Sequence, residues 1–239
     1  VSDDYSSAIN IAARKTYTFI RHMNSGSTNY DAPDLMQYIL AMDSACMFGC
    51  LMMRMYGIAS VFSMRNNYMP VSLVNYLYSN TRLSPSTQEY DLYSELTANL
   101  SDFRTWINIY MTKLASFAVP GNFNIFKRHA WMVSKVYKDS TSGMSQMYAF
   151  RPTYVYKYDE VNAELTPVDL FNPTKAFRLA DWYAIGDSLL NAIVQSEDFN
   201  VMSGDILKAY GSNLVKFPSI SEVYNVVPVY EPEVLTEIE

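Results

Sequence analysis

The amino-acid sequence predicts a mainly α-helical protein with a small antiparallel β element. Apolar residues recur at spacings of three and four through much of the first half, which is the period of one helix face. Between residues 131 and 158 the period changes to two, which is typical of strands. The chain has 239 residues, of which 49% are hydrophobic, so it can bury a full core. With no repeat or linker in the sequence, we expect a single domain over residues 1–239.

The first helix is predicted to follow Ser2, because a serine caps free N–H groups and the next residues, Asp3 and Asp4, favour the positive end of the helix dipole. The polar stretch 24–27 (NSGS) ends it. Its apolar face comprises Tyr5, Ile9, Ala12, Thr16, Phe19 and Met23.

A second start signal is DAPD at residues 31–34, because proline is tolerated in a first helical turn. The helix over residues 33–56 is apolar on most of its circumference, which predicts a place in the core or in an interface. We expect it to close at Gly57. Shorter helices are expected over residues 58–66, 71–78, 84–99 (opened by Ser84 and Pro85) and from a cap at Ser101 and Asp102 to residue 114.

The β element is expected at residues 130–158. Strand-like alternation covers 131–137 and 146–158, and the turn-forming sequence DSTSG lies between them. Helix should return at 174–195, capped by Thr174, and at 203–210, closed by Gly211. Residues 223–230 contain Pro228 and predict an edge strand, which begins an extended C-terminal arm over residues 223–239. Because Val1 replaces Met and residues 231–239 look like a helix cut short, we expect an excerpt from a longer polypeptide.

The composition argues against several classes of function. A net charge of −6 leaves no contiguous basic surface of the kind that sequence-independent nucleic-acid binding needs. No run approaches the ~18–20 consecutive apolar residues of a membrane span, and no signal peptide is visible. We therefore expect a soluble chain without a membrane partner. With only 2 Cys, a disulfide framework is excluded and a reducing compartment is expected.

Residues that carry catalysis or bind metals are few. Cys46 and Cys50 lie four apart on the apolar helix but lack the further ligands that zinc needs, so we expect core packing. His22 and His129 each lie beside an arginine, and no nucleophile elbow or phosphate loop accompanies them. An enzyme that uses His129 with a nearby acid is the least favoured interpretation. We expect no enzyme, no metal, no cofactor and no small-molecule substrate.

The residues that remain abundant are typical of protein contacts: the chain has 20 Tyr and 14 Met, and only 18% of its residues are charged. Much of the Met lies in the apolar helix, which favours Tyr as the contact residue. Lys127 and Arg128 are candidates for RNA contact, although a solvated basic corner is the favoured explanation. Candidates for subunit contact are Tyr5, Tyr148, Tyr154, Tyr156, Tyr158, Tyr224 and Tyr230.

Four segments resemble the capsid proteins of picobirnaviruses, small double-stranded RNA viruses. They occur in the same order over most of the chain, and none is a mechanistic signature. The segments are NYDAPDLMQY at 29–38, NFNIFKRH at 122–129, MSGDILKAYG at 202–211 and VPVYEPEVL at 227–235.

The resemblance implies the helical shell-domain architecture of a coat protein that dimerises and assembles into an icosahedral particle around the genome. It also implies location in the virion, after assembly in the host cytoplasm. Family members are usually longer, with a basic N-terminal arm and a projecting β-rich region. The chain is therefore expected either to be the shell-domain part of a larger protein or to keep, in the hairpin at 130–158, what remains of the projection. Family self-cleavage is assigned to no residue here. The alternative is a cytoplasmic helical scaffold or binding protein with a non-viral partner.

Overall fold

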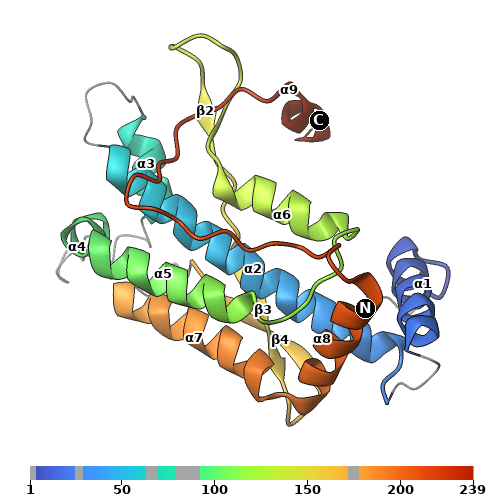
Figure 1. Ribbon diagram of the computed structural model, residues 1–239. Coiled ribbons are helices and arrows are strands. Elements are labelled where there is room, and N and C mark those ends of the chain that lie inside the picture. The colour runs from blue at the N-terminus through green and yellow to red at the C-terminus, as the bar shows by residue number, and fades with distance from the viewer. Residues whose placement is uncertain (1–3, 25–28, 63–68, 79–91, 172–177, 239) are drawn as a thin grey trace.

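A single long helix, α2 (Ala32–Val61), forms the centre of the computed structural model, and the other elements lie around it (Figure 1). The structure describes residues 4–24, 29–62, 69–78, 92–171 and 178–238. Asp31 and Asp34 form a reciprocal capping box at the start of α2, with Pro33 in the first turn. Most of the helix is buried on every side, as the sequence predicted.

α2 is long and apolar enough to cross a membrane by length and composition alone, but 83% of that stretch is buried inside the chain. A count of consecutive apolar residues does not detect this helix as a membrane span, because Asp43 and Arg54 interrupt the run. Its burial against other helices is that of a core helix.

The remaining helices cover α2 from several sides. α5, α6 and α7 pack along it, whereas α1 packs mainly on α2 and α8 (Figure 1). Their bounds are α1 (Ala8–Met23), α3 (Val71–Tyr78), α4 (Leu92–Ala98), α5 (Leu100–Leu114), α6 (Asn124–Ser134), α7 (Leu179–Gln195), α8 (Glu197–Tyr210) and α9 (Pro232–Ile238).

The β element consists of two separate antiparallel pairs in the described part of the chain. β1 (Tyr137–Lys138) pairs with β2 (Met147–Tyr148) across the predicted turn. β3 (Tyr154–Asp159) pairs with β4 (Glu164–Asp169), whose Pro167 lies opposite Tyr156. The longer pair packs on α2 and α7 through β3. The predicted hairpin over 130–158 was therefore only partly correct, since the partner of β3 lies beyond it.

The predicted strand at 131–137 is wrong, because residues up to Ser134 belong to α6. Phe126 and Val133, seven residues apart, are buried on the same side of this helix, which packs on α2. The short alternating pattern that suggested a strand is outweighed by this helical spacing and by contact with the core.

Three predicted helix boundaries are also wrong. The N-cap of α1 is Ser7, whose Oγ accepts a hydrogen bond from the Asn10 N–H, whereas Ser2 lies outside the described residues. Asn99 rather than Ser101 is the N-cap of α5. α8 begins after Ser196, which caps it through the Phe199 N–H, and not at residue 203.

Gly57 does not end α2, which continues to Val61 and includes the start of the separate helix predicted at 58–66. The glycine is required for close approach instead, since a Cβ there would lie 2.6 Å from the Cγ2 of Val226. Gly211 does end α8, with a φ of 58°. The predicted starts at Ser84 and Thr174 and the later part of the 58–66 helix lie outside the described residues.

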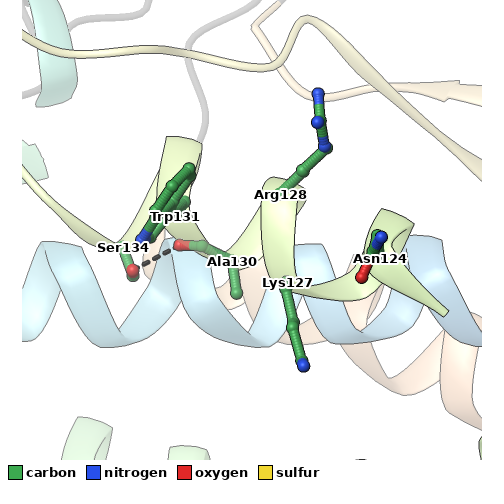
Figure 2. A pocket seen from close by; sticks show the side chains of 6 residues that line it. All are labelled: Asn124, Lys127, Arg128, Ala130, Trp131 and Ser134. Carbon is green, nitrogen blue, oxygen red and sulfur yellow. Dashed lines mark hydrogen bonds between the residues drawn. The ribbon is translucent and has the colours of Figure 1, made fainter. Parts of the chain in front are cut away.

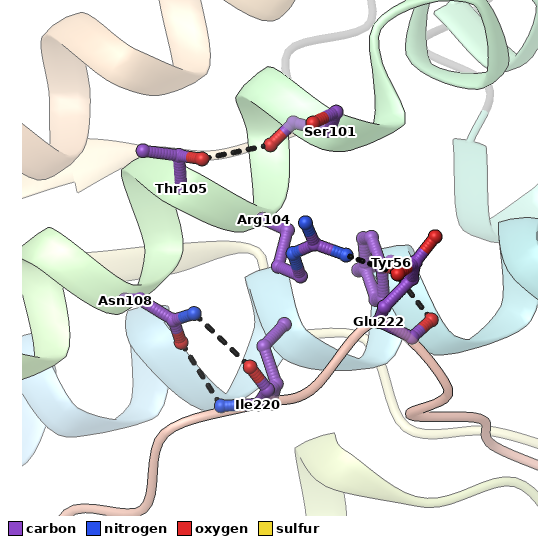
Figure 3. Close-up of polar contacts among 7 residues, drawn as sticks. All are labelled: Tyr56, Ser101, Arg104, Thr105, Asn108, Ile220 and Glu222. Carbon is purple, nitrogen blue, oxygen red and sulfur yellow. Dashed lines mark hydrogen bonds and ion pairs between the residues drawn. The ribbon is translucent and has the colours of Figure 1, made fainter.

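A C-terminal segment, residues 214–231, crosses α2 and α5 without regular secondary structure, and we call it the strap (Figures 1 and 3). Asn108 of α5 donates to the carbonyl of Ile220 (3.0 Å) and accepts from its N–H (2.9 Å). The Tyr56 hydroxyl donates to the carbonyl of Glu222 at 3.1 Å, and Ser60 Oγ donates to that of Tyr224 at 3.0 Å. Side chains of two helices therefore satisfy the strap's backbone in place of a sheet.

The far end of the strap lies beside β1. Val229 exchanges backbone hydrogen bonds with Val136 and Lys138, both at 2.9 Å, and this isolated bridge is the one strand-like contact recorded for residues 223–230. The predicted edge strand is therefore wrong, although the segment is held in an arm-like path. Helix α9 follows it, as the end of the sequence suggested.

Many tyrosines serve the interior rather than the surface. Each of five buried rings places its hydroxyl on a backbone carbonyl, which removes the cost of burying the polar atom. The donors are Tyr38, Tyr56, Tyr78, Tyr110 and Tyr137, and the acceptors are Ala118, Glu222, Met55, Ala45 and Trp131. The prediction that much of the Met lies in the apolar helix and is core is confirmed, with five methionines of α2 buried: Met36, Met42, Met52, Met53 and Met55.

Candidate contact surfaces

The apolar face of α1 is mostly left open by the rest of the chain. The helix buries Ala13, Thr16 and Ile20 against the body. Of the face predicted from the spacing, Thr16 is therefore buried, whereas Ile9 and Phe19 remain 38% and 41% exposed, with the Phe19 ring 5.1 Å from that of Tyr210. An amphipathic helix whose apolar side is half covered is suited to pack on another surface.

Tyr5 precedes this helix and is 76% exposed, so it lies on the surface as predicted for a contact residue. The guanidinium of Arg14 packs 4.4 Å from its ring centroid, and the same side chain donates to the backbone carbonyl of Tyr5 at 2.6 Å. A cation over an aromatic face orders the ring at the surface.

β3 presents a second aromatic surface. Tyr154 and Tyr156 point outward and are 47% and 39% exposed, with their rings edge-to-face at 5.4 Å, whereas Val155 between them is buried. Tyr158 departs from this alternation because its ring packs 4.3 Å from that of Phe199 and only 8% of the residue is exposed. Its side chain is covered within the chain, so we leave it out of the contact surface.

The other tyrosine candidates are placed less favourably. Tyr148 is half-buried and stacks on Tyr137 at 5.7 Å. Tyr224, within the strap, is half-buried, and its backbone carbonyl accepts the hydrogen bond from Ser60 of α2. Tyr230, at the end of the strap, is 38% exposed. The structure therefore gathers the candidates into no single patch, and the most exposed ones lie on α1 and β3.

The basic residues of α6 flank a shallow cavity of about 530 Å³ that opens on this helix (Figure 2). Lys127 and Arg128 are both exposed, but their side chains leave the helix on opposite sides. Trp131 lies one turn beyond Arg128. The two cations predicted for RNA contact therefore line the same cavity, with side chains that point in different directions.

His129, the next residue of α6, faces the core. Its Nδ1 lies 2.5 Å from Oδ2 of the buried Asp43 on α2. Burial raises the pKa of Asp43, and the hydrogen bond to the carboxylate raises the pKa of His129. Oδ1 of Asp43 has no hydrogen-bond partner in the described residues. The pair ties α6 to α2.

The cysteines are buried and free, as expected of core packing. The part of the chain that the structure describes holds no group of three His, Cys, Asp or Glu able to bind a metal.

Sequence reasoning did not identify the exposed face of α1 as a contact surface, although it named Tyr5 as a contact candidate. Its signal was present in the spacing of Ile9, Phe19 and Met23, but periodicity marks an apolar face without saying what covers it. The Asp43–His129 contact had no signal, because the two residues lie far apart in sequence.

Comparison with known proteins gives one consistent result. The family model for the picobirnavirus capsid protein matches residues 1–239. The capsid protein precursor of Human picobirnavirus (strain Human/Thailand/Hy005102/-) is 32% identical over 237 residues, covering 98% of this chain and 41% of that protein. The X-ray crystallographic structure of the picobirnavirus capsid matches with a TM-score of 0.79 and 27% identity, over 99% of this chain and 44% of that one.

The chain thus spans less than half the length of these two relatives. The match nevertheless covers the helical core, the β pairs and the strap together, and it agrees with the resemblance carried by the four sequence segments. Because the family model matches from the first residue to the last, the chain belongs to the picobirnavirus capsid protein family.

Proposed function

We propose that this chain acts as a structural coat subunit that dimerises and self-assembles into an icosahedral capsid around a double-stranded RNA genome. Its place is then the virion, after assembly in the host cytoplasm. The observation that carries the proposal is the whole-chain match to the capsid family, together with a fold shared with a solved capsid. A structural role accounts for the chain without catalysis, and the Asp43–His129 pair then holds two helices together.

The physical basis of assembly would be burial of the α1 and β3 surfaces against other copies of the chain. Both expose apolar or aromatic side chains on elements that are otherwise anchored to the body. Each such contact contributes little, but a closed shell repeats it many times, so small changes in one contact are multiplied.

The test uses particle yield, measured by size-exclusion chromatography with light scattering and by negative-stain microscopy of the full-length coat protein that carries this chain. Replacing Tyr154 and Tyr156 with serine, or Ile9 and Phe19 with serine, should lower the yield on the order of tenfold or more, because each subunit loses the same buried area. Ile109→Ser is the matched control, since Ile109 is 51% exposed on α5, outside both surfaces.

Circular dichroism of each variant separates a failure to assemble from a failure to fold. A well-folded wild-type protein that remains monomeric at high concentration contradicts the proposed function. Equal loss of particles in all three variants leaves capsid function standing but contradicts the assignment of these two surfaces.

RNA contact through Lys127 and Arg128 is a subordinate proposal, supported only by their exposure on α6. In the same particles, replacing both with alanine should lower the amount of double-stranded RNA recovered, and the difference from the wild type should shrink at higher salt, because the variant makes fewer salt-sensitive phosphate contacts. The alternative function, a scaffold for a non-viral protein, would instead yield a stoichiometric complex with that protein and no particles.

A further inference from the structure

A second cavity, of about 590 Å³, lies between α2, α6 and the strap, and four sulfur-containing residues are among those that line it. Cys46, Cys50 and Met53 contribute from α2, and Met111 contributes from α5. The three α2 residues are spaced at i, i+4 and i+7, so they form one stripe along the helix. All four residues are buried, yet the cavity that they line gives access from outside.

Helix geometry and one close contact bring these residues together. Cys46 and Cys50, four residues apart on α2, lie on the same side of the helix and line the same cavity. Gly49 lies on the same side of α2, and a Cβ there would be only 2.5 Å from the Sδ of Met111. The thioether of α5 therefore lies against the turn of α2 that carries both cysteines, and this approach depends on the missing side chain of Gly49.

Two positively charged side chains, Lys127 and Lys216, line the same cavity. They would offset a negatively charged complex of a metal ion with two thiolates. Two thiolates that share one monovalent cation carry a net charge of −1, which the two ammonium groups would offset.

We propose that Cys46, Cys50, Met53 and Met111 form a binding site for one soft d¹⁰ metal ion, copper(I). Thiolate and thioether ligands select copper(I) over harder ions, whereas zinc sites draw on thiolate, imidazole and carboxylate ligands. In the binding step copper(I) forms bonds to the two cysteine sulfurs and both thiol protons leave to solvent. The two methionine sulfurs, already in place, complete the coordination without losing protons.

The experiment titrates the purified, reduced chain into the copper(I)–bicinchoninate complex under anaerobic conditions and follows the loss of colour. The wild type should remove one copper per chain. Because the chain has only 2 Cys, Cys46→Ala/Cys50→Ala should remove this binding entirely. Met53→Leu and Met111→Leu should each weaken it on the order of tenfold, the scale at which ligand-shell changes alter metal affinity.

Met52→Leu is the matched control, because Met52 is fully buried on α2 next to Met53 but does not line the cavity. X-ray absorption at the copper edge should show more than two sulfur atoms bound to copper in the wild type. In Met111→Leu the number of bound sulfur atoms should be smaller. The leucine variants preserve volume and remain folded, so they test the site even if the double cysteine variant does not fold.

Three results would overturn the proposal. Copper could stay with bicinchoninate when the wild type is added. Met53→Leu and Met111→Leu could bind as tightly as Met52→Leu. Half an equivalent of copper could bind with a doubling of mass in light scattering, which would place the metal between chains.

Discussion

Replacing Gly186 with alanine should destabilise the chain, although alanine is the better helix former. Gly186 lies inside α7, and a Cβ there would be 2.4 Å from a ring carbon of Trp106 and 2.8 Å from one of Phe48. Trp106 cannot easily move, since its ring also packs 5.3 Å from that of Tyr110 and 4.8 Å from that of Tyr183.

Two effects of opposite sign decide the magnitude. Alanine gains about 0.8–1.0 kcal/mol over glycine in a helix interior. Forcing an extra carbon into a packed core costs about 1–3 kcal/mol, and the upper end applies where aromatic rings must shift. We therefore expect a net loss of about 2 kcal/mol in the free energy of unfolding.

Gly204 in α8 provides the matched comparison, because a Cβ there would have nothing within 4 Å. Gly204→Ala should stabilise the chain by about 0.5–1 kcal/mol. In urea, with a slope of about 3 kcal/mol per molar, the midpoint of Gly186→Ala should fall by about 0.7 M while that of Gly204→Ala rises. Tryptophan fluorescence reports both, and a rise for Gly186→Ala would refute the reasoning.

Two further predictions concern contacts between distant segments. Asn108→Ala removes both hydrogen bonds to Ile220, so it should lower the free energy of unfolding, measured in urea, by about 1–3 kcal/mol. The same variant should speed cleavage of the strap in limited proteolysis. An unchanged cleavage rate would contradict the strap's dependence on Asn108. The Asp43 carboxylate raises the pKa of His129 above the unfolded value of 6.5, so their attraction stabilises fully below that pH and is lost as the pH rises through the raised pKa. In His129→Gln the melting temperature should fall less over this rise in pH, and an equal fall would exclude the pair as its cause.

The sequence was most informative where a local signal and the tertiary structure agree. The start of α2 follows from Asp31, Pro33 and Asp34, whose capping interactions are local. The prediction ended the same helix too early, because glycine is typical of a helix C-terminus. Gly57 is instead required by the close approach of Val226 from the strap. A contact made by a segment far along the chain leaves no trace in the local pattern.

The strap and the contact surfaces show the same limit. The strap is held by Asn108, Tyr56 and Ser60 from two helices, so the strand-like pattern at 223–230 does not produce a strand. Tyrosine content suggested surface contacts, yet Tyr38 and Tyr110 are interior hydrogen-bond donors. Composition counts residues of one type without separating those that face the core from those that face outward.

The burial of α2 on all sides has a consequence for cooperativity. Helices α5, α6 and α7, the strand β3 and the strap are each anchored to this one helix. Loss of any layer would expose apolar surface of α2 to water, which raises the free energy of partly unfolded states relative to the native and fully unfolded ones. The chain should therefore unfold as one unit, with the backbone amides of α2 the last to exchange with solvent.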